Sequence, residues 1–316
     1  MLYQPDTAMN QIFFTIMRLQ NIILLIALLL WAPLLMTTGY AEKSSDDPVK
    51  NLSVKEKFDN AISYFESEYG PEEARQLNAL KEELIAKGHD EDVVQELLSE
   101  AELNTRVAEL FRENLLRSTD AGDVTYEDFA GRIDLQDLKE KSHQFVEDHK
   151  QELLDAEETY GVDYRYIVGI KGIETRYGAD GMTGDYVLLN SLVTQYVLSN
   201  RKTFSVRELD AVLKLNQKYN AEIQHAKGSF AGAVGVAQWM PFSLLHYAVL
   251  EDIDDIQSTH KMIPSTANYL RENGWRPSLN GEPIERGSPN WNAIRRYNHS
   301  DTYVQVVIDI AEQIER

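Results

Sequence analysis

The sequence of 316 residues contains no cysteine. Disulfide bonds, thiolate nucleophiles and thiolate metal ligands are therefore excluded. A lipid-anchored N-terminus, which requires a cysteine, cannot form either. The seven histidines show no HExxH pair or other ligand spacing, so a histidine-based metal site is not expected.

Positive charge is scarce. The chain has 31 lysine and arginine residues against 51 aspartate and glutamate residues, a net charge of -20. Proteins that bind a phosphate backbone need a positive surface, so nucleic acid is not expected as a partner. The hydrophobic content of 43% is ordinary for a globular protein, and the length allows one large or two modest domains.

Sustained alternation of polar and apolar residues, the pattern of a β-strand, is also missing. Helical patterns dominate from about Leu52 onward, which predicts an all-α fold. Pro71 and Gly88 bracket one expected helix, and Asp90 caps another. Further helices are expected at about residues 135–158, 186–200, 206–219 and 301–314.

The segment 227–241 is rich in glycine and alanine but has neither a GxGxxG nor a GxSxG motif. It is therefore neither a dinucleotide-binding loop nor a nucleophile elbow. A bare backbone of this kind suits a loop that lies against a ligand. A small-residue turn that lets helices pack closely is an equally good interpretation.

The N-terminal segment has the pattern of a secretory signal. Arg18 precedes an apolar run from Ile22 to Met36, which is followed by the small-residue site Gly39-Tyr40-Ala41. Cleavage after Ala41 would release the rest of the chain. An uncleaved membrane anchor formed by residues 22–36 is the alternative, although the run is short for a span. The true start is left open among Met1, Met9 and Met17.

The segment from Tyr160 to Gly178 predicts one short helix with an unusual face. Asp163 is a good N-cap and Gly178 a good residue to follow the helix. Ile167, Ile170 and Glu174 follow at i, i+3 and i+7, so a carboxylate stands at the end of an apolar stripe. Burial disfavours the ionised form of a carboxylate, which would keep Glu174 able to act as an acid.

Two alternatives for Glu174 remain open: a solvated residue near a helix end, or half of an ion pair with Lys171 or Arg176. The same helix contains Gly169 and Gly172, each of which costs about 1 kcal/mol relative to alanine in a helix interior. We therefore expect another backbone or a ligand to approach this face closely.

Several motifs that follow one another in a fixed order resemble the catalytic domain of the B-type lytic murein transglycosylases. The resemblance extends from about Asp90 to the C-terminus and is close after Tyr160. The matching residues are Gly172-Ile173-Glu174-Thr175-Arg176-Tyr177-Gly178, Lys227-Gly228-Ser229-Phe230-Ala231-Gly232-Ala233, Gln238 with Met240-Pro241, Ala267-Asn268-Tyr269, and Arg296-Tyr297-Asn298-His299-Ser300.

This resemblance implies a lysozyme-like helical catalytic domain that cleaves the β-1,4 MurNAc–GlcNAc bond of peptidoglycan without water and leaves a 1,6-anhydro-MurNAc end. Glycan strands would be the partner, no cofactor would be needed, and the protein would be periplasmic. Peripheral contact with the cell wall or membrane and the oligomeric state are left open. The implied domains are a signal peptide at 1–41, an acidic helical subdomain at 42–125 and the catalytic domain at 126–316.

The resemblance also implies roles for single residues. Glu174 would act first as acid and then as base. Ser229 would contact the N-acetyl group of the substrate, and Arg201 the glycan or peptide stem. The cleavage point would be surrounded by Gln238, Tyr269, Tyr297 and Asn298, with Tyr126 as a looser match in the same groove.

Three features depart from the family pattern. Residues 250–256 lack the D-x-D-x-D-G spacing of an EF-hand-like calcium loop, so we expect no metal site and no need for calcium. The connection from Trp275 to Trp291 is short, which would leave the groove more open. Lys202 stands where an arginine is frequent, so bidentate geometry would be lost.

Two other functions remain as alternatives to the transglycosylase. One is a muramidase that hydrolyses the same bond, and the other is a non-catalytic peptidoglycan-binding protein of the same fold. An intact Glu174 on an apolar face disfavours the binding protein, because a binding module does not need a buried acid.

The export hypothesis predicts a mature chain that begins at Glu42. N-terminal sequencing of protein recovered from the periplasmic fraction should find this residue. Full-length chain in the membrane fraction would instead support the anchor formed by residues 22–36.

Overall fold

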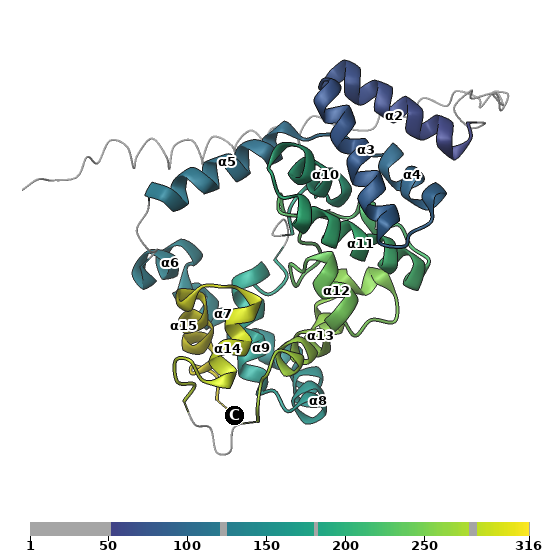
Figure 1. The fold of residues 1–316 in the computed structure, drawn as a ribbon. Helices are drawn as coiled ribbons and strands as arrows, with labels where there is room; N and C mark the ends of the chain where they lie inside the picture. The colour runs from purple at the N-terminus through teal and green to yellow at the C-terminus, as the bar shows by residue number, and fades with distance from the viewer. Residues whose placement is uncertain (1–51, 121–124, 180–182, 278–282, 316) are drawn as a thin grey trace, which may run out of the picture. The chain divides into compact units, whose positions relative to one another are not determined.

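Helices make up nearly all of the regular structure in the computed structural model, which describes residues 52–120, 125–179, 183–277 and 283–315 (Figure 1). The contacts of the chain place residues from Leu52 onward in one unit. The predicted signal segment, residues 1–41, lies outside the described residues. None of the helices described is long and apolar enough to cross a membrane.

The first helices are α2 (Val54–Glu68), α3 (Pro71–Ala86) and α4 (Glu91–Ser99), which pack against one another. The predicted helix boundaries are confirmed. Pro71 begins α3, and Gly88 follows it with a φ of 96°. The Asp90 side chain accepts hydrogen bonds from backbone N–H groups in the first turn of α4. The core side of α3 is formed by Leu77, Leu80 and Leu84, all fully buried. These residues are part of one continuous hydrophobic core that extends through the rest of the described chain.

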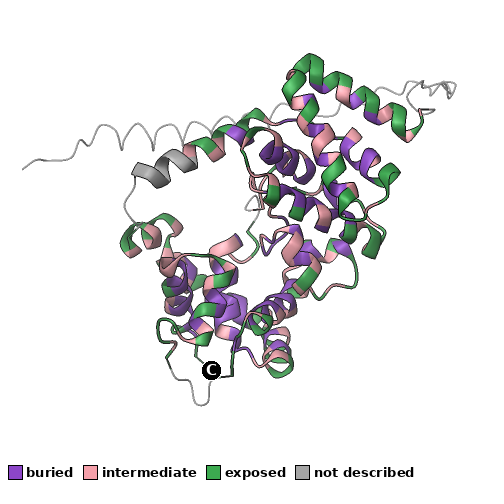
Figure 2. Cartoon of the chain, viewed as in Figure 1, coloured by how far each residue is buried: buried purple, intermediate pink, exposed green. Residues whose placement is uncertain are grey.

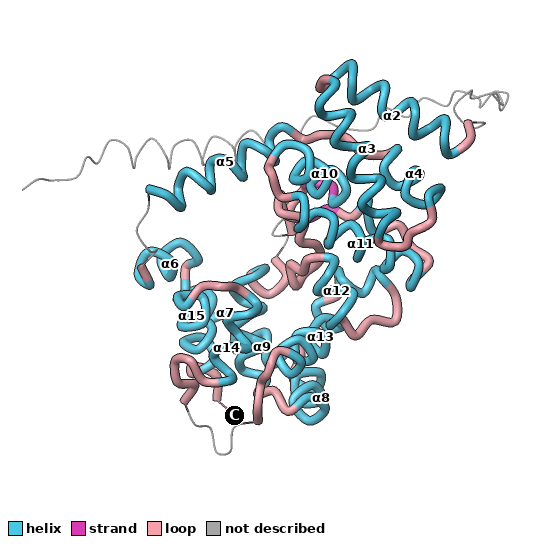
Figure 3. The backbone as a smooth tube through the Cα atoms, in the orientation of Figure 1, coloured by secondary structure: helices cyan, strands magenta, loops and turns pink. Residues whose placement is uncertain are grey.

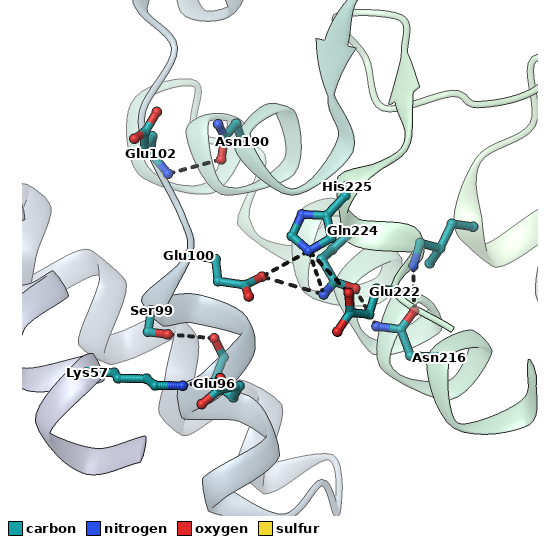
Figure 4. A network of polar contacts seen from close by, with 11 residues as sticks. Lys57, Glu96, Ser99, Glu100, Glu102, Asn190, Asn216, Glu222, Gln224 and His225 are labelled. Atoms are coloured by element: carbon teal, nitrogen blue, oxygen red, sulfur yellow. Dashed lines mark hydrogen bonds and ion pairs between the residues drawn. The ribbon is translucent and has the colours of Figure 1, made fainter. Parts of the chain in front are cut away.

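A polar network joins the segment after α4 to the middle of the chain (Figure 4). The Glu102 backbone N–H donates to Asn190 Oδ1 at 3.0 Å, in α10 (Leu188–Leu198). Glu100 Oε2 lies 3.6 Å from His225 Nε2, in the 3₁₀ turn η2 (Ile223–His225), and accepts a 3.5 Å hydrogen bond from Gln224. The acidic N-terminal helices are thus attached to the segments that carry the motifs. The domain boundary at 125/126 stays a prediction.

The next helices are α5 (Thr105–Asp120), α6 (Tyr126–Ile133), α7 (Leu135–Asp148) and α8 (Lys150–Tyr160). The prediction of one long helix at 135–158 was wrong, because the chain turns at His149, where φ is −125° and ψ is 24°. The His149 ring packs against Phe145, with the ring centroids 4.6 Å apart. Histidine does not break helices by itself, so the periodic pattern continued through the turn.

The middle of the chain forms α9 (Tyr164–Thr175), α10 and α11 (Lys202–Tyr219). The helix expected at 186–200 begins at Leu188, because Tyr186–Val187 forms the short strand β1 instead. β1 pairs antiparallel with β2 (Lys227–Gly228), and this ribbon lies beside α10 (Figure 3). In the described part of the chain this is the whole of the sheet structure, which confirms the all-α class.

The last elements are α12 (Pro241–Tyr247), η3 (Ile253–Gln257), α13 (Thr259–Glu272), α14 (Pro289–Tyr297) and α15 (Asp301–Ala311). α9 packs against α15, α7, α13 and α8, and buried residues run along both α9 and α15 (Figure 2). Ile167 and Ile170 are fully buried, as the helical pattern predicted. The helix with the candidate acid is therefore enclosed by four others.

Gly169 marks the place where α9 and α15 touch. A Cβ atom at this position would lie 2.7 Å from the Val307 carbonyl oxygen, well inside van der Waals contact. At Gly172 a Cβ would lie 2.5 Å from the Tyr177 hydroxyl. The expectation that another backbone approaches this face closely is confirmed at Gly169, whereas the group that lies against Gly172 is the side chain of Tyr177.

Gly169→Ala should lower the free energy of unfolding by about 1–3 kcal/mol, the usual cost of overpacking a rigid contact. The matched control is Gly131→Ala in α6, where a Cβ meets nothing within 4 Å. There alanine should stabilise the helix by about 1 kcal/mol. Urea unfolding of both variants measures the difference, and equal midpoints would contradict the tight contact of α9 with α15.

Candidate active site

Glu174 lies in the last turn of α9 and is half-buried. Its Oε1 accepts a hydrogen bond of 2.8 Å from the hydroxyl of Tyr303, which is itself buried in α15. Because α9 and α15 touch at Gly169, the Tyr303 side chain reaches Glu174 directly. The carboxyl group thus stands at the edge of the apolar face, held from the neighbouring helix.

The surroundings of Glu174 favour its neutral form. Burial raises the pKa of the Glu174 carboxyl to about 7, while the Tyr303 hydrogen bond and the positive charge of Lys171 act in the opposite direction. A carboxyl group with such a pKa is available near neutral pH both as a proton donor and as a proton acceptor. This agrees with the prediction of an acid on an apolar face.

The sequence left open an ion pair between Glu174 and Arg176, and this interpretation was wrong. The Arg176 guanidinium donates to the Ile133 carbonyl oxygen at 2.7 Å and pairs with Asp137. Lys171 is fully buried, and its ammonium nitrogen has no hydrogen-bond partner among the described residues. Its influence on Glu174 is therefore a charge interaction without a direct contact.

The end of α9 is more strained than the sequence suggested. Gly178 was expected to end the helix alone, but Arg176, Tyr177 and Gly178 all have left-handed backbones, with φ of 49°, 65° and 85°. A non-glycine residue in this region costs roughly 1–3 kcal/mol. The contacts of Arg176 and a 3.0 Å hydrogen bond from the Tyr177 hydroxyl to the Leu138 carbonyl oxygen hold the turn.

An aromatic cluster stands next to the carboxyl group. The Tyr297 hydroxyl donates to the Ala237 carbonyl oxygen at 2.9 Å and accepts from the indole N–H of Trp239. The rings of Tyr269 and Tyr297 lie 5.0 Å apart. Burial raises the pKa of Tyr297 well above its usual value, and the charge of Glu174 acts on Tyr297 in the same direction. The structure thus brings two of the predicted residues, Tyr269 and Tyr297, together near the acid.

The glycine- and alanine-rich loop at 227–241 is tied to the same helix. The Thr175 hydroxyl donates to the Val236 carbonyl oxygen at 3.0 Å. Gln238 has a φ of 50°, and its side-chain amide donates to the carbonyl oxygens of Thr183 at 3.1 Å and Gly235 at 3.0 Å. The Gln238 side chain is therefore fixed between this loop and the segment at Thr183.

Small residues in this loop serve packing within the protein. A Cβ at Gly232 would lie 2.9 Å from Leu192 of α10, and one at Gly235 would lie 2.5 Å from the Ile256 carbonyl oxygen. The packing interpretation is confirmed at these two positions. Ser229 shapes the loop because its Oγ accepts a 3.1 Å hydrogen bond from the Ala233 N–H. Contact of Ser229 with a ligand stays a prediction.

Three predicted residues have described contacts that do not reach Glu174. The Arg201 guanidinium lies over the rings of Phe204 and Phe111, 4.1 and 4.8 Å from their centroids. The Tyr126 hydroxyl donates to Asp309, and Asn298 is exposed at the end of α14. Their roles around a substrate stay predictions.

The described residues contain no group of three or more histidine, aspartate or glutamate side chains arranged to hold a metal ion. In the segment 250–256, the Asp255 carboxylate accepts from the backbone N–H groups of Glu251 at 2.9 Å and Asp252 at 3.1 Å. This carboxylate thus caps the turn η3.

Sequence reasoning missed Tyr303. It lies at a buried position of the predicted C-terminal helix, yet nothing local in the sequence distinguishes it from a core residue. Its partner Glu174 is 129 residues away, so the contact becomes visible once the packing of α15 on α9 is known.

Solved structures share this fold. The chain matches the Escherichia coli lytic transglycosylase Slt35 in complex with calcium, with a TM-score of 0.62 and 24% identity over 75% of this chain and 92% of that one. It also matches SltB3 of Pseudomonas aeruginosa in complex with NAG-anhNAM-pentapeptide, with a TM-score of 0.61 and 22% identity over 76% of this chain and 78% of that one. The fold is that of the lysozyme-like lytic transglycosylases.

The chain belongs to the transglycosylase SLT domain family, which its residues 72–286 match. The family resemblance of the sequence motifs is thereby confirmed. Among characterised relatives, the membrane-bound lytic murein transglycosylase B of Escherichia coli (strain K12) is 34% identical over 135 residues. That match spans 42% of this chain and 37% of the relative's length.

Tyr303→Phe should raise the pKa of Glu174 by about one unit, because a hydrogen bond to a carboxylate favours the charged form and its loss favours the neutral form. Carbon-13 NMR of the glutamate carboxyl groups measures this titration directly. The matched control is Tyr196→Phe, which removes a 2.6 Å hydrogen bond from a buried tyrosine to Glu83. An unchanged titration of Glu174 in Tyr303→Phe would contradict the role given to this contact.

Proposed function

We propose that this protein is a lytic transglycosylase that cleaves the β-1,4 bond between MurNAc and GlcNAc in peptidoglycan and leaves a 1,6-anhydro-MurNAc end. The observation that carries this proposal is the half-buried Glu174, whose pKa lies at about 7 and whose hydrogen-bond partner is an uncharged tyrosine. Membership of the transglycosylase family and the glycan bound in the SltB3 complex support it.

The chemistry needs one residue that gives and then takes a proton. Protonated Glu174 donates its proton to the glycosidic oxygen as the bond to C1 breaks. The N-acetyl oxygen of the substrate stabilises C1, and the Glu174 carboxylate then accepts the proton of the C6 hydroxyl as that oxygen closes the anhydro ring. A pKa near 7 suits both steps, since neither form of the carboxyl group is then strongly disfavoured.

A hydrolase would need a second carboxylate. An inverting enzyme uses it to activate water, and a retaining enzyme uses it as the nucleophile. The described groups that act on Glu174 are the Tyr303 hydroxyl, through a hydrogen bond, and Lys171, through its charge, and neither is a carboxylate. The C6 hydroxyl, which the substrate itself holds near C1, then competes with water through its proximity. The muramidase is therefore the second candidate, and the binding protein the third.

The remaining site residues are assigned by their positions in the family motifs. Tyr269 and Tyr297 form the wall beside Glu174, and Gln238, which is fixed by its hydrogen bond to Thr183, lies at the cleavage point. Ser229 contacts the substrate N-acetyl group from the loop at 227–241. Asn298 and Tyr126 extend the glycan site, and Arg201 contacts the glycan or peptide stem.

The location and domain organisation are part of the same proposal. The protein is exported to the periplasm by the signal at residues 1–41, and its partner is the glycan strand of the cell wall. Residues 42–125 form the N-terminal subdomain and residues 126–316 the catalytic domain. No calcium is needed, because the segment 250–256 uses its Asp255 carboxylate to cap η3.

Digestion of purified sacculi in heavy-oxygen water tests this function. The wild-type protein should release anhydro ends that carry no label, because water does not enter the product. Glu174→Gln should keep the fold but lower the release at least about 10²-fold, the low end for loss of a general acid. Mass spectrometry of the released muropeptides measures both results.

Glu158→Gln, an exposed carboxylate in α8, is the matched control and should turn over sacculi normally. Labelled reducing MurNAc as the main product would support the muramidase instead. If the folded wild-type protein releases no muropeptides, the non-catalytic binding protein is the function supported. Near-normal release of muropeptides by Glu174→Gln would show that Glu174 does not act in the mechanism.

A further inference from the structure

Lys171 is a lysine in a place where the fold should bury an apolar side chain. Its side chain is 1% exposed, among the most completely buried large side chains described. Its ammonium nitrogen has no hydrogen-bond partner among the described residues. An isolated buried charge is strongly disfavoured, so a group of this kind calls for a physical explanation.

The position of Lys171 on α9 supplies that explanation. It precedes Glu174 by three residues, and side chains with this spacing are neighbours on a helix surface, with Cβ atoms about 5–6 Å apart. No ion pair within 4 Å joins the two groups in the described structure, yet the charge that acts on Lys171 is that of Glu174. Burial leaves this charge interaction weakly screened by water.

We propose that Lys171 is a positioning residue of the active site, whose buried ammonium group stabilises the carboxylate that Glu174 becomes when it gives up its proton. This inference rests on the proposed role of Glu174 as general acid and base. Lys171 does not touch the substrate, because its side chain is closed off from solvent. It acts through Glu174.

The other titratable groups near Glu174 do not supply a charge at neutral pH. Tyr303 on α15 and Tyr297 on α14 have pKa values well above the usual range because both are buried. Tyr269 on α13 has its pKa raised to about 12, also by burial. These three hydroxyl groups therefore stay protonated while Glu174 titrates.

Several carboxylates on the helices that pack against α9 have partners of their own. On α7, Asp137 pairs with Arg176 and with Lys141 at 2.9 Å. On α8, Glu152 lies 2.8 Å from His260 Nδ1.

On α15, Asp309 accepts from Tyr126, and Asp301 pairs with Arg295 at 2.7 Å and with Arg286. Also on α8, Glu157 accepts from the Tyr164 N–H at 3.3 Å. Among the described residues, Lys171 is the cation whose charge acts on Glu174.

The two groups titrate as a coupled pair. Burial lowers the pKa of Lys171 to about 7 and raises that of Glu174 to about 7, while each opposes the shift of the other. Removing the ammonium group should make Glu174 hold its proton to higher pH. Removing the carboxylate should make Lys171 lose its proton at lower pH.

The first test is the pH profile of anhydro-muropeptide release by Lys171→Met, which keeps a long apolar chain and loses the charge. The alkaline limb, where Glu174 loses its proton, should move up by about one unit or more. Lys171→Arg, which stays charged, should not move the limb upward. Lys150→Met, the loss of an exposed lysine in α8, is the control for net charge and should leave the limb in place.

The second test needs neither turnover nor a folded Lys171→Met. Nitrogen-15 NMR of labelled lysine side chains follows the titration of Lys171 in the wild-type protein and in Glu174→Gln. The midpoint should fall by about one unit or more in Glu174→Gln and stay unchanged in Glu158→Gln.

The outcomes separate the two proposals. A limb that does not move in folded Lys171→Met, or a Lys171 midpoint that does not fall in Glu174→Gln, overturns the role of Lys171. A purely structural lysine would alter the melting temperature without moving either titration. Failure of the wild-type protein to form anhydro ends would refute the proposed function, and the NMR result would still report whether the two charges interact.

Discussion

The contact between the backbones of α9 and α15 at Gly169 determines how the site is built. Since no side chain separates the helices there, α15 lies close enough for Tyr303 to hold the Glu174 carboxyl group. The loop at 227–241 is attached to the other side of the same helix end by Thr175. The orientation of the acid thus follows from one close helix contact and one loop attachment.

The protonation of Glu174 is a balance between burial and two stabilising neighbours. Burial alone would strongly favour the neutral acid. Glu174 would then donate its proton to the glycosidic oxygen with difficulty, although its carboxylate would readily accept the proton of the C6 hydroxyl. The Tyr303 hydrogen bond and the Lys171 charge favour the carboxylate and oppose this shift. A residue that acts in both directions needs such a balance, which neither an exposed nor a fully isolated carboxyl group provides.

Local features of the site could be predicted from the sequence, and contacts between distant segments could not. Asp163, Gly169 and the Ile167–Ile170 face were recognisable because capping, helix propensity and periodicity depend on nearby residues. The left-handed backbones of Arg176 and Tyr177 were not, because contacts with α6 and α7 hold them. The turn at His149 was missed because no proline or glycine stands there to interrupt the helical pattern.

The hydrogen bond between Tyr303 and Glu174 joins residues 129 positions apart. Closing so long a loop has an entropic cost that is offset once the intervening helices have packed. The acid therefore has this partner only where α15 is docked on α9. A chain with every element up to α14 in place would still lack the Tyr303 hydroxyl, so the protonation of the acid depends on the docking of α15.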